Sequence, residues 1–207
     1  VISVVTQVRV DKEDPSFKKP SKPIGPFYTK EEADAEAAKD GSTYVEDAGR
    51  GYRKVVPSPM PKEIVEKEAV RALVEADVLT ICSGGGGIPV VAEDGQYVGV
   101  EAVNDKDFSA RVLAENVDAD RLIILTGVDN IYINYNQPDQ KALEQISVAE
   151  AEEYIKEGHF AAGSMLPKIE AALDFVKGDD KRKAIITSIE NLENIDKEAG
   201  TVISQKG

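Results

Sequence analysis

Short apolar runs rich in Val and Ile recur along this chain, and helical patterns lie between them. The apolar runs cover residues 1–5, 78–82, 122–125 and 184–187, and the helical patterns cover residues 61–76, 107–117, 147–156 and 167–177. Apolar runs without polar alternation are typical of parallel strands that are covered on both faces. Strands that alternate with helices predict an α/β fold, here a three-layer αβα sandwich with a mainly parallel central sheet.

The last two helical patterns carry recognisable end signals. The run Ser147-Val148-Ala149-Glu150 matches a capping box, and Pro167 suits the first turn of a helix. Gly178 suits a C-terminal cap. The apolar stripe of the final helix comprises Ile169, Leu173 and Val176. These signals support helices at both places.

The composition is that of a globular protein with an acidic surface. Of the 207 residues, 42% are hydrophobic and 30% are charged, and the formal net charge is -13. Such a charge argues against general binding of nucleic acid or of an anionic membrane, because both need a basic face on the protein. No apolar stretch reaches membrane-spanning length. We therefore expect neither a nucleic-acid partner nor a membrane partner.

The use of cysteine indicates a reducing compartment. Cys82 is the single cysteine, which excludes an internal disulfide framework, and the sequence opens without a signal peptide. The sequence therefore predicts a cytoplasmic protein. Cys82 itself is expected to be a small core residue, because nothing nearby in the sequence would lower the pKa of its thiol.

The segment 11–56 differs from the rest of the chain. It is rich in Pro, Gly, Lys and Glu, with a short helix-like piece at 31–39. We interpret it as an excursion from a core formed by residues 1–10 and 57–207. The chain also opens at Val1 inside an apolar run rather than at a methionine, so we expect a fragment of a longer protein.

Two lysines at predicted helix starts suggest phosphate chemistry. Lys106 lies in the run Val103-Asn104-Asp105-Lys106-Asp107-Phe108, and Lys168 lies in Ser164-Met165-Leu166-Pro167-Lys168-Ile169-Glu170. A helix N-terminus carries partial positive charge, so a lysine there strengthens an anion site. Asp107, beside Lys106, could hold both ammonium groups in place. Each lysine taken alone also fits an ordinary solvated helix start.

Two loops that follow predicted strands are candidate ligand sites. Gly84–Gly87 allow positive φ and close approach of a ligand, but four glycines fit a structural turn equally well, and neither a dinucleotide fingerprint nor a Walker A loop is present. Leu125-Thr126-Gly127-Val128-Asp129-Asn130 lies at the carboxyl end of a strand, where α/β sheets usually bind ligands. A plain turn would look the same.

Two further residues have open or negative interpretations. Lys22, flanked by three prolines, is expected in an extended loop, where it could be a solvated linker residue. His159 is the only histidine, and we do not expect it to act as a general base, because it lies in the loop 158–164 between two predicted helices.

Taken together, five segments resemble the carbamate kinases of the amino-acid-kinase family. They are Lys22-Pro23-Ile24-Gly25-Pro26-Phe27, Cys82-Ser83-Gly84-Gly85-Gly86-Gly87-Ile88-Pro89, Leu125–Asn130 and the two lysine segments. The resemblance implies a sandwich of the amino-acid-kinase type, with residues 11–56 as a protruding subdomain that covers the active centre. Tyr52 and Ala162 depart from the family, where Trp and Pro are common.

The resemblance also implies roles for individual residues. Lys106 would contact nucleotide phosphates, Asp107 would orient the lysines, and Lys168 would neutralise charge on the transferring phosphoryl group. Lys22 would reach into the active centre from the protruding subdomain. The acceptor side would include Gly84, Gly85 and Gly86, and the nucleotide pocket Thr126, Gly127, Val128, Asp129, Met165, Pro167 and Lys168.

The implied reaction is phosphoryl transfer between ATP and carbamate. It would run from carbamoyl phosphate and ADP toward ATP in arginine fermentation, with Mg²⁺ on the nucleotide, no metal site built by the protein alone and a homodimer as the assembly. The family's first glycine-rich phosphate loop has no counterpart after Val1, which predicts that this chain binds ADP or ATP more readily than it turns over. The alternatives are an inactive nucleotide-binding fragment, or an acetylglutamate or uridylate kinase, against which the KPIGPF and RKVVPSP segments argue.

Overall fold

The computed structural model describes residues 1–47 and 49–207, and these divide into two compact units. One unit comprises Val1–Glu66 and Val78–Ser109, and the other comprises Lys67–Asp77 and Ala110–Gly207. The boundary falls inside helix α3 (Lys106–Asn116), whose first turn belongs to the first unit. Each unit has its own sheets and its own buried residues.

The first unit contains a four-stranded mixed sheet with the order β6-β2-β8-β9. Its strands are β2 (Gln7–Arg9), β6 (Glu63–Ile64), β8 (Ile88–Glu93) and β9 (Gln96–Gly99). β2 and β8 run parallel, whereas the two outer ladders are antiparallel. Val8, Ile64 and Val90 are buried in this sheet. A separate parallel pair joins β1 (Ile2–Ser3) to β7 (Thr80–Ile81).

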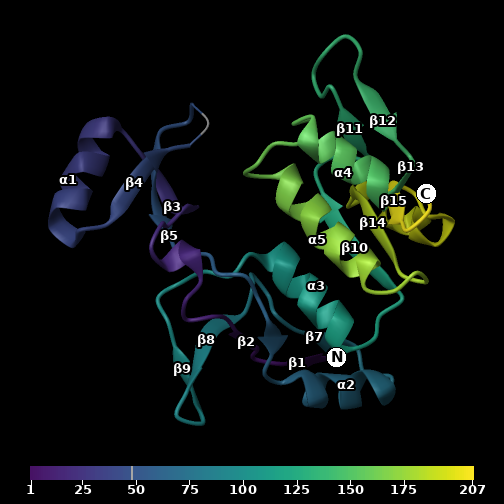
Figure 1. Ribbon diagram of the computed structural model, residues 1–207, viewed down its shortest axis with the longest axis horizontal. Coiled ribbons are helices and arrows are strands. Elements are labelled where there is room, and N and C mark those ends of the chain that lie inside the picture. The colour runs from purple at the N-terminus through teal and green to yellow at the C-terminus, as the bar shows by residue number, and fades with distance from the viewer. Residues whose placement is uncertain (48) are drawn as a thin grey trace. The chain divides into compact units, whose positions relative to one another are not determined.

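Within the segment 11–56, a second sheet forms in the same unit (Figure 1). Its antiparallel strands are β3 (Lys22–Tyr28), β4 (Thr43–Glu46) and β5 (Tyr52–Val56) in the order β3-β5-β4, preceded by the 3-10 helix η1 (Pro15–Phe17). Helix α1 (Lys30–Asp40) connects β3 to β4. A Thr29–Glu32 capping box starts α1, and left-handed Gly41 ends it. The segment thus has local signals of its own for every element.

The second unit is built on the mixed sheet β10-β14-β15-β13. Its strands are β10 (Arg121–Thr126), β13 (Gln145–Ser147), β14 (Lys183–Ser188) and β15 (Thr201–Ser204), with a hairpin of β11 (Ile131–Ile133) and β12 (Lys141–Leu143) and the 3-10 helix η2 (Glu190–Lys197). β10 and β14 are parallel, and so are β13 and β15, but β14 and β15 are antiparallel. The protein is therefore α/β, with mixed sheets in both units.

Helices α4 (Val148–Lys156) and α5 (Met165–Lys177) pack on the sheet of the second unit (Figure 1). Helix α2 (Lys67–Glu75) belongs to the same unit. The core of the unit gathers α5, β14 and β15, with Phe175, Ile169, Ile186 and Ile203 fully buried. The predicted stripe of α5 is buried as expected, since Leu173 and Val176 belong to this core. No helix within residues 1–47 and 49–207 is long and apolar enough to cross a bilayer.

The apolar runs 1–5 and 78–82 do not form buried strands, contrary to the prediction. Each keeps only two paired residues, and Val1, Val5 and Leu79 are 81%, 76% and 70% exposed. Among the described residues, β1 and β7 pair only with each other, so no further strand shields them. An apolar run indicates a segment that gains from cover, but it does not specify the covering element.

The other two runs differ from each other. Residues 184–187 are buried on both faces of β14, as predicted. β10 instead alternates, with Leu122 and Ile124 buried but Ile123 and Leu125 40% and 38% exposed, so only one of its two faces is covered. A continuous apolar run thus identified the strand but not its one-sided cover.

Two helix starts differ from the predictions. The pattern 61–76 begins as a strand, because Glu63–Ile64 pair with β2, and α2 starts only at Lys67. α5 begins at Met165, which leaves Pro167 inside the first turn, where proline is tolerated. Gly178 is the C-cap of α5, as predicted, and adopts the right-handed conformation (φ -70°). The Ser147–Glu150 capping box of α4 is confirmed.

Candidate functional site

The start of α3 gathers buried acidic side chains around a lysine. Asp105 and Asp107 are 8% and 6% exposed, whereas the side chain of Lys106 is 58% exposed. Asp105 Oδ1 accepts a hydrogen bond from the Asp107 backbone N–H (2.9 Å), and the Asp105 carbonyl accepts one from Ser109 N (3.0 Å). Asp105 therefore acts as the N-cap of α3. Lys106 Nζ lies 3.3 Å from Asp107 Oδ2.

Lys22 joins this cluster from strand β3. Its Nζ lies 2.5 Å from Asp105 Oδ2, across 83 residues of sequence. The first unit thus brings together Lys22, Lys106 and Asp107, which the sequence had marked, through Asp105, to which it had assigned no role. The Asp-Lys-Asp spacing contained a signal, because an aspartate that precedes a helix often accepts a hydrogen bond from the N–H two residues on.

The pKa of Asp105 is shifted in a direction that keeps it charged. Burial alone would raise this pKa, but the hydrogen bond from Lys22, the Asp107 backbone N–H and the charges of Lys22 and Lys106 outweigh burial. The net result is a pKa below the usual value for aspartate. Asp105 is therefore a carboxylate at neutral pH and a suitable ion-pair partner.

The glycine loop that follows β7 packs against this cluster. At Gly86, with φ +135°, a Cβ would lie 2.4 Å from the Asn104 carbonyl oxygen, and at Gly87, with φ +76°, it would lie 2.5 Å from Val8 Cγ2. The Gly86 carbonyl accepts a hydrogen bond from Ser109 Oγ of α3 (2.8 Å). Gly86 and Gly87 are thus required by packing. Gly84 and Gly85 are exposed and have no neighbour within 4 Å of a would-be Cβ.

Unsatisfied polar atoms lie beside the same loop. Asn104 is 1% exposed, and both polar atoms of its side chain lack a hydrogen-bond partner. The Ser83 hydroxyl is buried and likewise without a partner. Buried polar groups are nearly always satisfied, and such exceptions often occur at functional sites. The sequence analysis had not singled out either side chain.

A pocket of about 320 Å³ lies at the carboxyl end of β10 in the second unit. Its wall includes Thr126, Gly127, Val128 and Met165, four of the residues that the resemblance assigned to the nucleotide. The residues that sequence reasoning missed in this wall are Tyr132, Tyr135, His159, Phe160, Ala161 and Ser164. Aromatic side chains with no carboxylate among them suit a planar, apolar ring such as a nucleobase. No linear motif joins these residues, because they come from separate segments of the chain, 132–135 and 159–164.

The remaining predicted nucleotide residues lie outside this wall. Lys168 is half-buried in the first turn of α5, three residues after the lining residue Met165, and Pro167 directly precedes it. The Asp129 side chain is exposed, and the Asp129 carbonyl accepts a hydrogen bond from Thr187 Oγ1 (3.3 Å). Lys168 and Asp129 belong to the second unit, whereas Lys22 and Lys106 belong to the first.

His159 and Cys82 have local environments that explain their side chains without catalysis. His159 Nε2 lies 3.0 Å from Glu157 Oε2, and its ring meets Tyr154 edge-on at 5.8 Å. Burial, and then the charge of Glu66, raises the pKa of the Cys82 thiol, which opposes thiolate formation. Neither group has the environment of an activated nucleophile.

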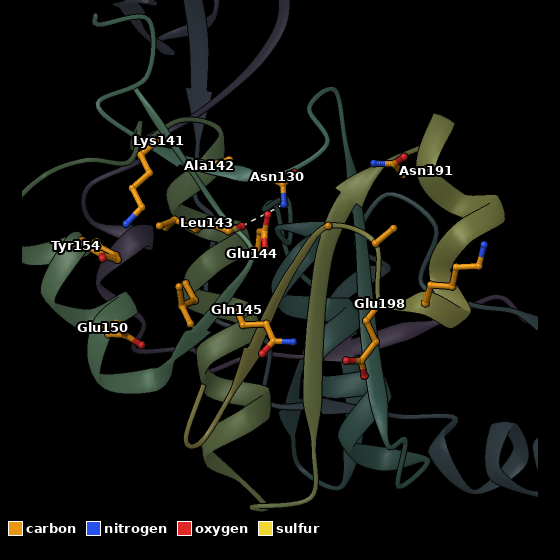
Figure 2. A pocket seen from close by; sticks show the side chains of 14 residues that line it. Asn130, Lys141, Ala142, Leu143, Glu144, Gln145, Glu150, Tyr154, Asn191 and Glu198 are labelled. Atoms are coloured by element: carbon orange, nitrogen blue, oxygen red, sulfur yellow. Dashed lines mark hydrogen bonds between the residues drawn. The ribbon is translucent and has the colours of Figure 1, made fainter. Parts of the chain in front are cut away.

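A larger cavity of about 870 Å³ occupies another part of the second unit (Figure 2). Figure 2 shows Asn130 directed at the Leu143 carbonyl, to which it donates a hydrogen bond of 3.1 Å. The charged lining residues are Lys141, Glu144, Glu150, Lys197 and Glu198. Because carboxylates outnumber lysines there, this cavity is poorly suited to a polyanionic nucleotide despite its size.

No group of three or more His, Cys, Asp or Glu side chains in the described part of the chain could hold a metal ion.

Comparison with known proteins places these features in a family. Residues 29–188 match the Amino acid kinase family. Carbamate kinases from Lentilactobacillus hilgardii and Clostridium perfringens are 55% and 56% identical to this chain over 208 and 191 residues, which are 100% and 92% of the chain. The chain spans 65% and 61% of the length of these two relatives.

Solved structures give the same result. A carbamate kinase from Giardia lamblia bound to citric acid has a TM-score of 0.90 at 43% identity, covering 98% of this chain and 64% of that one. The same protein bound to AMP-PNP has a TM-score of 0.85 at 46% identity, covering 98% of this chain and 65% of that one. From the sequence match and the shared α/β fold, the chain belongs to the amino acid kinase family.

Proposed function

We propose that the protein transfers a phosphoryl group between ATP and carbamate. The observation that carries the proposal is the cluster of Lys22, Asp105, Lys106 and Asp107 beside the glycine loop. Phosphoryl transfer needs in-line positioning and neutralisation of charge rather than a covalent intermediate. Lysines held by carboxylates at a helix N-terminus supply both. The similarity to carbamate kinases supports carbamate as the acceptor.

The two units are proposed to divide the work. The aromatic pocket of the second unit would hold the adenine ring, which is consistent with the AMP-PNP that the Giardia lamblia protein binds. Lys106 would contact the phosphates, Asp107 would orient the lysines, and Lys168 would neutralise the transferring group. Lys22, with the exposed Gly84 and Gly85, would serve carbamate or carbamoyl phosphate.

Several finer features belong to the same proposal. Mg²⁺ would accompany ATP or ADP, and the reaction would run toward ATP in arginine fermentation. The protein would be a cytoplasmic homodimer with a three-layer core around a mainly parallel sheet. Residues 11–56 would form a lid, and their separate sheet, whose ladder joins none of the other described strands, supports that division.

The test varies each substrate in turn with the full-length protein and measures ATP formed from carbamoyl phosphate and ADP. Lys22→Ala should raise the KM for carbamoyl phosphate and leave that for ADP nearly unchanged. Lys54→Ala is the matched control, because Lys54 lies in the same small sheet but pairs with Asp40 at 3.0 Å. A loss of ADP affinity in Lys22→Ala, with an unaltered carbamoyl phosphate dependence, would place Lys22 on the nucleotide side.

A second candidate function is nucleotide binding without transfer. The aromatic pocket favours it for this chain, because the pocket is complete within the second unit. Calorimetric titration with ADP measures binding separately from turnover. Saturable ADP binding by the full-length protein without ATP formation would overturn the transfer proposal and establish the second candidate. Phosphorylation of acetylglutamate or UMP, but not of carbamate, would instead indicate another amino-acid kinase.

A further inference from the structure

We propose that Asp105 is the positioning residue of Lys22, which it holds ready for the carbamoyl phosphate side of the reaction. This inference rests on the function proposed above. Asp105 uses both carboxylate oxygens, and it uses them on different parts of the first unit. Oδ1 accepts the Asp107 N–H at 2.9 Å within α3, and Oδ2 pairs with Lys22 at 2.5 Å from β3. One side chain therefore ties the small sheet to the start of the helix.

The burial of this pair separates it from ordinary surface ion pairs. The Asp105 and Lys22 side chains are 11% and 35% exposed. A second pair, Lys12–Glu93, also joins the segment 11–56 to the rest of the unit at 2.5 Å, but its side chains are 67% and 39% exposed. Exposed pairs contribute little, whereas breaking a buried pair leaves an uncompensated charge. The Lys22–Asp105 pair is thus expected to hold its lysine in place more firmly than the exposed Lys12–Glu93 pair does.

The charges around Lys22 argue for positioning rather than simple attraction of an anion. Lys22 and Lys106 contribute two positive charges, and Asp105 and Asp107 contribute two negative ones. The cluster is neutral as a whole, so its value to an anionic substrate depends on where each ammonium group points. A lysine on its own is flexible and loses rotamer entropy when it is fixed. Asp105 fixes Lys22 before the substrate arrives.

The competing explanation is that Asp105 serves only as the helix cap. Asp105→Asn separates the two roles, because asparagine keeps an oxygen that can accept the Asp107 N–H and is an equally good N-cap. It removes the charge that pairs with Lys22. Asp105→Glu keeps the charge and should restore part of any loss. Glu93→Gln is the matched control, because it neutralises the exposed pair.

The first arm of the test needs no activity. Brief labelling of the native chain with acetic anhydride, followed by peptide mass spectrometry, measures the reactivity of each lysine. Lys22 should react about tenfold faster in Asp105→Asn than in the wild type, as expected for loss of a hydrogen bond to a charged group. In Glu93→Gln, Lys12 should change while Lys22 stays protected. Equal Lys22 labelling in the wild type and in Asp105→Asn would overturn the inference.

The second arm is a double-mutant cycle in the full-length protein. Lys22→Ala and Asp105→Asn should each raise the KM for carbamoyl phosphate, and the double variant should be no worse than Lys22→Ala alone. Effects that multiply in the double variant would show that Asp105 acts independently of Lys22 and would refute the positioning role. If Asp105 protects Lys22 from labelling but the protein makes no ATP, the proposed function is refuted. If the protein makes ATP but Lys22 is labelled equally in the wild type and in Asp105→Asn, only this inference is refuted.

Discussion

The tightest contact at the candidate site predicts a large effect of a single methyl group. In Gly86→Ala, the new Cβ would lie 2.4 Å from the Asn104 carbonyl oxygen and 3.0 Å from its carbonyl carbon, both backbone atoms that cannot rotate away. The φ of +135° at Gly86 is also a conformation that L residues rarely adopt. The loop must therefore move when alanine is introduced.

The expected cost can be worked from these contacts. A non-glycine residue in such a conformation costs roughly 1–3 kcal/mol. Moving the Gly86 carbonyl also breaks its 2.8 Å hydrogen bond with the buried Ser109 hydroxyl, and an unsatisfied buried group of this kind costs about 1–3 kcal/mol. These two ranges add, so we expect Gly86→Ala to lower the free energy of unfolding by about 2–6 kcal/mol, at the upper end of what point mutations do.

Gly85→Ala is the matched control, one residue away. A Cβ at Gly85 has no neighbour within 4 Å, and its φ is outside the left-handed region. This substitution should be neutral or stabilise by up to about 1 kcal/mol, because alanine restricts the unfolded chain. Urea unfolding followed by circular dichroism compares both variants with the wild type. Equal stability of the two variants would refute the packing role of Gly86.

Three further predictions concern the second unit. Lys168→Ala should lower kcat by about 10²–10³ with a smaller change in ADP affinity, whereas Lys177→Ala at the other end of α5 should not; an unchanged kcat would make Lys168 an ordinary helix residue. Tyr135→Ala should weaken ADP binding about tenfold in calorimetry through lost stacking, and unaltered binding would exclude the aromatic pocket. Burial, and then the charge of Asp174, raises the pKa of Glu170. Protonated Glu170 therefore stabilises the folded protein below the usual glutamate pKa, and this contribution is lost as the pH rises through the raised pKa. Glu170→Gln should therefore raise the Tm at pH 7 but not at pH 4, and an equal gain at both values would contradict this sign.

Local signals in the sequence predicted the fold well where local chemistry decides it. The Ser147–Glu150 capping box and the apolar stripe of α5 are both present, because caps and stripes depend on neighbours three or four residues away. The predictions that were wrong concern which strand faces are covered by other elements. Residues 1–5 and the edge strand β10 looked buried, but their exposure depends on which elements pack beside them, and no periodicity reports that.

The candidate site likewise contains residues that a local motif could identify and neighbours that only the tertiary structure brings together. Lys106 and Asp107 could be selected from a short motif, since helix starts with charged residues have a physical reason to bind phosphate. The Lys22–Asp105 pair joins residues 83 positions apart, and the aromatic pocket draws on three separate segments of the chain, 126–128, 132–135 and 159–165. Such neighbours are set by tertiary structure, so the sequence could mark Lys22 but could not name its partner.

The most direct test of the account follows phosphorus itself. In ³¹P NMR of the full-length protein with carbamoyl phosphate, ADP and Mg²⁺, we expect the carbamoyl phosphate signal to fall as the γ-phosphate signal of ATP rises in equal amount. Release of inorganic phosphate without ATP, or no consumption of carbamoyl phosphate while ADP is bound, would contradict phosphoryl transfer at this site.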